Sequence, residues 1–230
     1  MFSTLDFDVI RRSWVYLFYE GMTFTLTLTA LSALGGLIFG TLIALMRLSS
    51  YRLLGRIAGL YVDFMRSLPL VLVIFWFYFL VPYIGQWLTG ASRPIRVGAF
   101  TSSLVTFIMF EAAYFSEIMR AGIQSISKGQ PAAANALGMT YAQTMRYVVL
   151  PQAFRNMLPV LLTQTIVLFQ DTSLVYVLSI PDFLGAASKV AQRDGRLVEM
   201  YLFAALVYFV ISCVASFGVR RLQARISIVR

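Results

Sequence analysis

Long stretches almost free of charge are the strongest constraint on how this chain can fold. A helix that crosses the hydrocarbon core of a bilayer needs about 20 mostly apolar residues, at ~1.5 Å rise each. Five stretches meet this requirement: Gly21 to Met46, Gly59 to Val81, Val97 to Met119, Asn156 to Ile180 and Met200 to Val219. We therefore expect an all-α polytopic membrane bundle of about five transmembrane helices, in a single domain of residues 1–230.

Composition supports a lipid-facing surface. Only 13% of the residues are charged and 59% are hydrophobic, whereas soluble domains carry about 25% charged residues. The sequence has no histidine and a single cysteine, Cys213. The usual metal ligands, an internal disulfide and the commonest general base are therefore missing. We predict no metal site, no cofactor and no catalytic residue.

The net charge of +9 could indicate nucleic-acid binding, but the arginines lie between and beside apolar runs, as in membrane loops. One side of the predicted membrane collects twelve basic residues: Arg47, Arg52, Arg56, Arg66, Arg120, Lys128, Arg146, Arg155, Arg220, Arg221, Arg225 and Arg230. The other side collects seven: Arg11, Arg12, Arg93, Arg96, Lys189, Arg193 and Arg196. The positive-inside rule then places the C-terminus in the cytoplasm and the N-terminus outside, with no nucleic-acid partner.

The first span has two features with alternative interpretations. Residues 23–29 alternate threonine with larger apolar residues, a strand-like period, but the uncharged run continues to Met46 and favours a helix. Gly36 and Gly40 form a GxxxG pair, which permits close helix contact but also occurs without a special partner.

Charged and polar residues in the spans are candidates for a transport pathway. Asp171 is either a pathway or gate residue or the end of a helix at Asp171-Thr172-Ser173. Arg66 either pairs with Asp63, three residues earlier, or attracts an acidic substrate. Gln164 and Gln170 offer amide donors, although six residues apart they need not share a face.

Other charges have simpler interpretations. Glu111 and Glu117 are six residues apart and point in different directions on an ideal helix, so we expect them to support helix packing or anchor a loop. Arg193, Asp194 and Arg196 lie outside the predicted spans. They either contact another protein or form an ordinary solvated loop.

The longest predicted cytoplasmic connection, from Arg120 to about Arg155, contains an alanine-rich segment. Pro131 to Tyr147 is expected to be helical, because proline suits the first turn of a helix. Gly138 should break or bend this helix midway. A short amphipathic element outside the bilayer either lies on the membrane surface or docks on a partner protein.

This segment resembles the cytoplasmic motif of bacterial ABC importer permeases, which reads EAA, three residues, Gly, nine residues, Ile, one residue, Leu-Pro. The chain has Ala132-Ala133-Ala134, then Gly138, Val148 and Leu150-Pro151 at every corresponding position. Ala132 replaces the opening glutamate of the motif and Val148 replaces its isoleucine, so the chain lacks the polar side chain that the glutamate would supply to the docking surface. Glu111-Ala112-Ala113 matches the letters but not the downstream spacing.

Further motifs resemble permeases of polar amino acid importers, in particular glutamate/aspartate importers, along nearly the whole chain. They are Phe64-Met65-Arg66-Ser67-Leu68-Pro69-Leu70, Ser116-Glu117-Ile118-Met119-Arg120-Ala121-Gly122-Ile123, Leu150-Pro151-Gln152-Ala153 and Gln170-Asp171-Thr172-Ser173-Leu174. The resemblance implies the type I ABC importer fold, a multi-pass location in the bacterial inner membrane, and residues 130–151 as a cytoplasmic coupling loop.

The same resemblance implies partners: a dimer of cytoplasmic ATP-binding subunits, a second permease subunit (homologous or identical) and a periplasmic amino-acid-binding protein. The chain lacks a GxxxxGK[ST] phosphate loop, so ATP hydrolysis is expected on a separate subunit. Two other classes stay open from the residues alone. One is a membrane-embedded enzyme using Asp63, Glu111, Glu117 or Asp171; the other is an ATP-independent channel or carrier. Import of a different polar amino acid is a further alternative.

Overall fold

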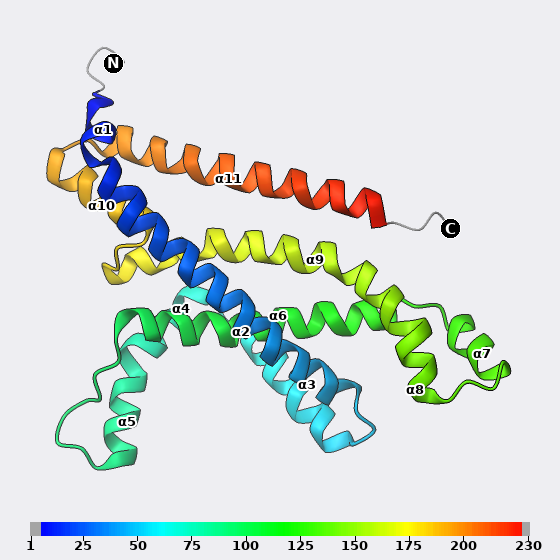
Figure 1. Ribbon diagram of the computed structural model, residues 1–230. Helices are drawn as coiled ribbons and strands as arrows, with labels where there is room; N and C mark the ends of the chain where they lie inside the picture. The colour runs from blue at the N-terminus through cyan, green and yellow to red at the C-terminus, as the bar shows by residue number, and fades with distance from the viewer. Residues whose placement is uncertain (1–5, 227–230) are drawn as a thin grey trace. The chain divides into compact units, whose positions relative to one another are not determined.

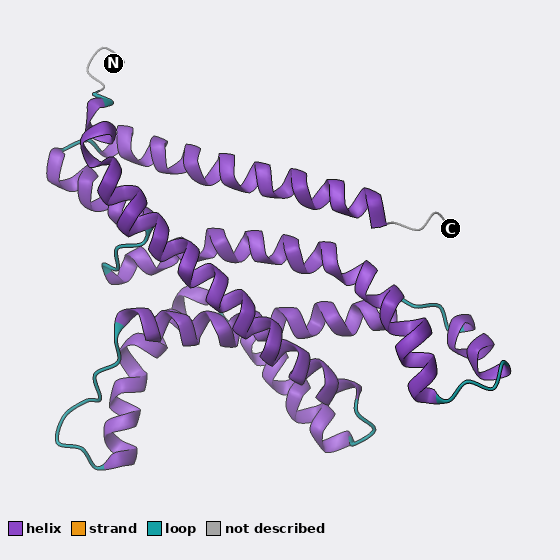
Figure 2. Cartoon of the chain, viewed as in Figure 1, coloured by secondary structure: helices purple, strands orange, loops and turns teal. Residues whose placement is uncertain are grey.

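The part of the protein described by the computed structural model, residues 6–226, is mainly helical and contains no strand (Figures 1 and 2). Arg230, which we assigned to the cytoplasmic side, and the ends of the predicted domain 1–230 lie outside the described residues. In chain order the helices are α1 Asp8–Val15, α2 Thr23–Leu48, α3 Arg52–Ser67, α4 Leu70–Phe75, α5 Val81–Thr89, α6 Ala99–Gln124, α7 Gly129–Ala136, α8 Tyr141–Thr144, α9 Leu150–Asp171, α10 Phe183–Asp194 and α11 Leu197–Ile226. Short π-helical segments, Tyr16–Met22, Trp76–Leu80 and Met145–Val149, join neighbouring helices, and a 3-10 segment, Thr172–Leu178, follows α9.

Within residues 6–226, five helical regions are long and apolar enough to cross a membrane: Asp8–Leu48, Leu70–Thr89, Ala99–Gln124, Tyr141–Leu178 and Leu197–Ile226. The helical fold class and the number of spans are confirmed. The threonine-rich start of the first span is helical, since Thr29 Oγ1 donates to the Thr25 carbonyl, 2.8 Å away, one turn earlier.

The second predicted span, Gly59 to Val81, is wrong in its bounds. The helix breaks at Leu68, which is extended with φ −98° and ψ 139°. Proline disfavours helical geometry in the residue before it, so Pro69 ends α3 at Ser67. Hydropathy alone does not detect this break, because the residues on both sides of it are apolar. The region that is long and apolar enough to cross the membrane is Leu70–Thr89.

The chain forms two compact units, each assembled from separate stretches. Unit 1 contains the described parts of Met1–Ala33, Pro69–Ile108 and Ile166–Ala215; unit 2 contains those of Leu34–Leu68, Met109–Thr165 and Ser216–Arg230.

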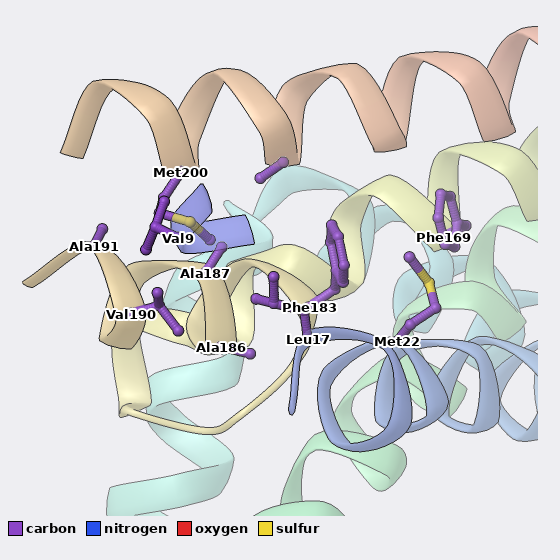
Figure 3. Close-up of a cluster of buried hydrophobic side chains, with 11 residues drawn as sticks. Val9, Leu17, Met22, Phe169, Phe183, Ala186, Ala187, Val190, Ala191 and Met200 are labelled. Carbon is purple, nitrogen blue, oxygen red and sulfur yellow. The ribbon is translucent and has the colours of Figure 1, made fainter. Parts of the chain in front are cut away.

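In unit 1, α10 is the centre of a buried apolar cluster. Phe183, Ala186 and Ala187 are fully buried, and Figure 3 shows them among side chains from the first helical region and α11. Gly21 allows close approach to α10, because a Cβ there would lie 2.9 Å from the Ala186 Cβ. Small residues on both helices therefore fix α10 against the first helical region.

In unit 2, α2 packs against α6 through Gly36 and Gly40. A Cβ at Gly36 would lie 2.8 Å from the Glu111 Cβ, and one at Gly40 would lie 3.0 Å from the Phe115 Cβ. The GxxxG pair thus has the packing role, as one of its two interpretations predicted. Tyr61 of α3 joins the same helix by donating to the Met109 carbonyl at 2.6 Å.

Candidate functional site

The alanine-rich segment forms a turn of defined geometry between α7 and α8. Pro131 lies in the first turn of α7, and Gly138 is in the left-handed region with φ +78°. Met139 N donates to the Ala134 carbonyl at 3.1 Å. A glycine in this conformation at a helix C-terminus is a Schellman motif. The predicted break at Gly138 is confirmed.

Side-chain hydrogen bonds hold the second half of the turn, and sequence reasoning missed them. Thr140 and Gln143 form a capping box at the start of α8. The buried Thr144 hydroxyl donates to Asn135 Oδ1 at 3.5 Å, which links α8 to α7. The signal was present as Thr-x-x-Gln before a helix.

One face of this segment is packed and the other is open. Ala134 is buried, whereas Ala132, Ala133 and Gly138 are exposed. Leu137 is 83% exposed and Tyr141 is 79% exposed. Because the backbone geometry is fixed by the Schellman motif and the capping box, these apolar side chains form a preorganised surface. We call the exposed residues Ala132, Ala133, Leu137, Gly138 and Tyr141 the loop surface.

The loop continues directly into α9. Leu150 and Pro151 begin this helix and are exposed. Beside them, Val149 and Ala153 are buried against Ile126, just beyond the end of α6. Movement applied to the loop surface would therefore reach α9 and α6 through packed contacts within unit 2.

An ionic cluster joins α2 to α6 in the same unit. The Glu117 carboxylate accepts hydrogen bonds from Arg47 of α2 and from Arg120, one turn away on α6. The side chains are only 17–27% exposed. The Glu117–Arg120 spacing could be seen in the sequence, but Arg47, 70 residues away, could not. Glu117 thus has the packing role that we expected.

The candidate pathway residues have different surroundings. The Arg66 guanidinium lies 5.4 Å from the centre of the Tyr114 ring, a cation–π contact. Within residues 6–226, Asp63 and Arg66 form no ion pair with each other, because the Arg66 guanidinium points to the Tyr114 ring instead. Gln164 donates to Glu111 Oε1 at 3.2 Å.

The other two pathway candidates belong to unit 1. Gln170 donates to the Ser212 hydroxyl at 3.0 Å. Asp171 ends α9, as the helix-end interpretation expected, but its carboxyl group does not cap the following 3-10 segment. These contacts place Gln164 and Gln170 in different polar networks.

A buried carboxyl group that sequence reasoning overlooked lies at the start of α10. Asp182 Oδ1 accepts from Gly185 N at 2.9 Å, and Oδ2 accepts from Leu184 N at 3.0 Å. Thr25 Oγ1 accepts from Phe183 N at 3.0 Å. Burial raises the pKa of Asp182 to about 7, against the opposing effect of the backbone donors. Aspartate before an apolar helical run is an N-cap signal that the sequence contained.

Comparisons with known proteins identify the chain's family. The model of the family described as binding-protein-dependent transport system inner membrane component matches residues 36–228. This chain belongs to that family. It is therefore a multi-pass inner-membrane permease subunit of an ABC importer, with ATP hydrolysis on a separate subunit. The interpretations as a membrane enzyme or an ATP-independent carrier are excluded.

Two relatives and one solved structure support this assignment to the permeases. The glutamate/aspartate import permease protein GltK of Escherichia coli O6:H1 is 53% identical over 96% of this chain and 97% of that protein. The glutamine transport system permease protein GlnP of Escherichia coli K12 is 33% identical, over 92% of this chain and 94% of that protein. A crystal structure of an amino acid ABC transporter with histidines has a TM-score of 0.87 at 33% identity, covering 96% of this chain and 99% of that chain. The family implies an ATPase, a substrate-binding protein and a second permease subunit as partners of this permease.

Proposed function

We propose that this permease subunit imports glutamate and aspartate. The observation that carries the proposal is the 53% identity to GltK across nearly the full length of both chains. Identity to GlnP, whose name specifies glutamine, is 33%. The runner-up is import of another polar amino acid by the same architecture.

Uptake by the reconstituted complex tests the substrate. The chain, its partner permease, the ATPase and the cognate binding protein are placed in proteoliposomes, and ATP-dependent uptake of labelled glutamate, aspartate and glutamine is measured. Glutamate and aspartate should accumulate at the higher rates. Faster accumulation of glutamine would support the runner-up and reject the acidic substrates.

The loop surface is proposed to dock on the ATPase. Within residues 130–151, Ala132, Ala133, Ala134, Gly138, Leu150 and Pro151 carry the permease motif. A side chain such as Leu137, 83% exposed beside a rigid turn, gains favourable burial if a partner covers it. The turn has little conformational freedom to lose on binding, which favours a docking role. ATPase movement would then pass to α9 and α6.

The orientation with the N-terminus in the periplasm and the C-terminus in the cytoplasm stays a proposal. The corrected second span, Leu70–Thr89, leaves Arg52, Arg56 and Arg66 before the membrane region, on the side with twelve basic residues. The charge difference that supports the orientation is therefore unchanged.

Arg66 is proposed to attract acidic substrates, with Gln164, Gln170 and Asp171 as further pathway candidates. An arginine guanidinium is a permanent cation in proteins, and that of Arg66 lies over the Tyr114 ring. Arg66→Ala should slow uptake of glutamate more than uptake of a neutral amino acid delivered through a matching binding protein. Arg52→Ala, on the same helix, is the control. Equal slowing of both substrates by Arg66→Ala would make Arg66 structural.

A further inference from the structure

Unit 2 contains a hollow that neither the loop surface nor the candidate pathway residues use. Its volume is about 310 Å³, within the range of small-ligand sites. It lies where α6 ends, α9 begins and α11 ends. The lining residues are Ser125, Arg155, Asn156, Pro159, Gln223 and Ile226.

The polar groups of the hollow favour an anion. No acidic residue lines it, and Arg155 supplies a cation. Asn156 Nδ2 donates to Ser125 Oγ at 2.8 Å, and Ser125 Oγ donates to the Gly122 carbonyl at 2.8 Å. These bonds orient the Asn156 amide and satisfy the serine hydroxyl. The Arg155 guanidinium and the Gln223 amide have donors that no described residue uses, which suits a phosphate group.

The charge around the hollow is one-sided. Arg220, Arg221 and Arg225 are on the last turns of α11, and no acidic residue follows Glu199 in the sequence. Within residues 6–226, Arg155, Arg220 and Arg225 form no ion pair, while Arg221 lies 4.5 Å from the centre of the Phe217 ring. Such a cluster beside a membrane span produces a positive potential that attracts anionic lipids.

Apolar side chains next to the hollow indicate that the anion belongs to a lipid. Phe154 and Val160 of α9 and Phe217 of α11 are each about half exposed. In a chain that crosses a membrane, such side chains face acyl chains. A phosphate held between these helix ends would therefore lie at headgroup depth.

We propose that this hollow binds the phosphate of an anionic diacyl phospholipid, with Arg155 as the principal contact and Gln223 and Asn156 as hydrogen-bond donors. The site does not depend on the identity of the imported amino acid. A free phosphate ion shares the headgroup chemistry but lacks acyl chains.

Lipid retention by the intact complex tests this site. The complex is reconstituted in nanodiscs of phosphatidylcholine with a minor fraction of phosphatidylglycerol, extracted in mild detergent, and its retained phosphatidylglycerol is measured by mass spectrometry. Wild type should retain phosphatidylglycerol above its fraction in the nanodisc. Arg155→Gln should lower retention about fivefold, because one basic residue near an anionic lipid surface contributes about 1 kcal/mol. Arg52→Gln, an equal charge change at another exposed site, should retain the wild-type amount.

Two results would overturn the proposal. The first is no enrichment of phosphatidylglycerol in wild type. The second is equal retention by Arg155→Gln and Arg52→Gln. If inorganic phosphate binds to wild type without enrichment of phosphatidylglycerol, the site is one for the free ion. If Arg155→Gln instead releases the ATPase from the complex while lipid retention is unchanged, the hollow is a protein contact and the lipid site is rejected.

Discussion

Asp182 shows how one residue connects burial, hydrogen bonding and pH. Its side chain has no solvent exposure, and both carboxyl oxygens accept backbone N–H groups at the start of α10. The donors favour the charged form, whereas burial favours the neutral form and raises the pKa to about 7. Since the sequence has no histidine, no imidazole of this chain titrates in the same range as Asp182.

Asp182→Asn should make stability less dependent on pH. The folded pKa of Asp182 is about 7, above the ordinary aspartate value of about 3.9, so between these two values the folded state binds more protons than the unfolded state. Stability should therefore fall as pH rises from about 4 to about 7 and level off above. At about 1.4 kcal/mol per pKa unit, the change from about pH 5 to about pH 7 is at most ~3 kcal/mol.

The measurement is the melting temperature of the purified complex across this pH range. Wild type and the control Asp8→Asn, whose side chain is 73% exposed, should share one slope. Asp182→Asn should show a flatter profile, because its amide stays neutral while still accepting an N–H bond. A slope equal to that of wild type would contradict the buried titration.

At the scale of helices, close backbone contact and chain breaks determine the packing. Sequence periodicity and hydropathy predicted the helices, and the GxxxG pair indicated where α2 could approach a neighbour. They did not identify α6 as that neighbour, because the contact joins residues about 75 apart in the sequence. The end of α3 at Ser67, two residues before Pro69, was predictable from local sterics, but the apolar residues around it led us to predict one continuous span.

Gly36→Ala should destabilise the packing of α2 on α6. The added Cβ would lie 2.8 Å from the Glu111 Cβ, closer than van der Waals contact, and overpacking of this kind costs about 1–3 kcal/mol. Gly59→Ala on α3 is the control, since its Cβ meets nothing within 4 Å. The melting temperature in detergent should fall for Gly36→Ala only. Equal melting temperatures for both variants would show that the contact is looser than described.

Gly138→Leu should uncouple ATP hydrolysis from transport. Gly138 has φ +78° and open space around a Cβ, so the substitution causes backbone strain of about 1–2 kcal/mol without a clash. The loop surface would then change shape while the spans stay inserted. Gly129→Leu is the control, since a Cβ at this loop position would meet only Ser127 Oγ, at 4.0 Å. Reconstituted vesicles should keep ATPase activity but lose uptake with Gly138→Leu; normal uptake would reject the role of this turn.

At the scale of the whole molecule, the arrangement of the chain depends on contacts between residues distant in the sequence, which a single sequence does not reveal. Helical class, span number and family followed from hydropathy and motif spacing. The division into two units could not be predicted in this way, because each unit combines three stretches that are distant in the sequence. Two contacts show such long-range pairing. Asp6 N donates to Glu199 Oε1, 193 residues away, and Arg47 pairs with Glu117. The loop surface was predictable in position, but its rigid turn required the structure.

Thiol labelling tests the proposed orientation across the membrane. In a Cys213→Ser background, Ser92→Cys should react with an impermeant thiol reagent added outside, whereas Ser50→Cys should react only after the membrane is opened. Both native serines are exposed, so the rest of the chain shields neither introduced thiol from the reagent. The reverse pattern would overturn the orientation taken from the twelve and seven basic residues.

Cross-linking at the loop surface tests most directly the claim that this permease receives ATPase movement there. In the Cys213→Ser background, Leu137→Cys and Trp87→Cys replace side chains of similar exposure, 83% and 81%, and each thiol carries a photoactivated cross-linker. The assembled complex should give a covalent adduct between Leu137→Cys and the ATPase, with a yield that changes on ATP binding, and none from Trp87→Cys. An adduct from Trp87→Cys alone, or no ATPase adduct from Leu137→Cys, would contradict the account.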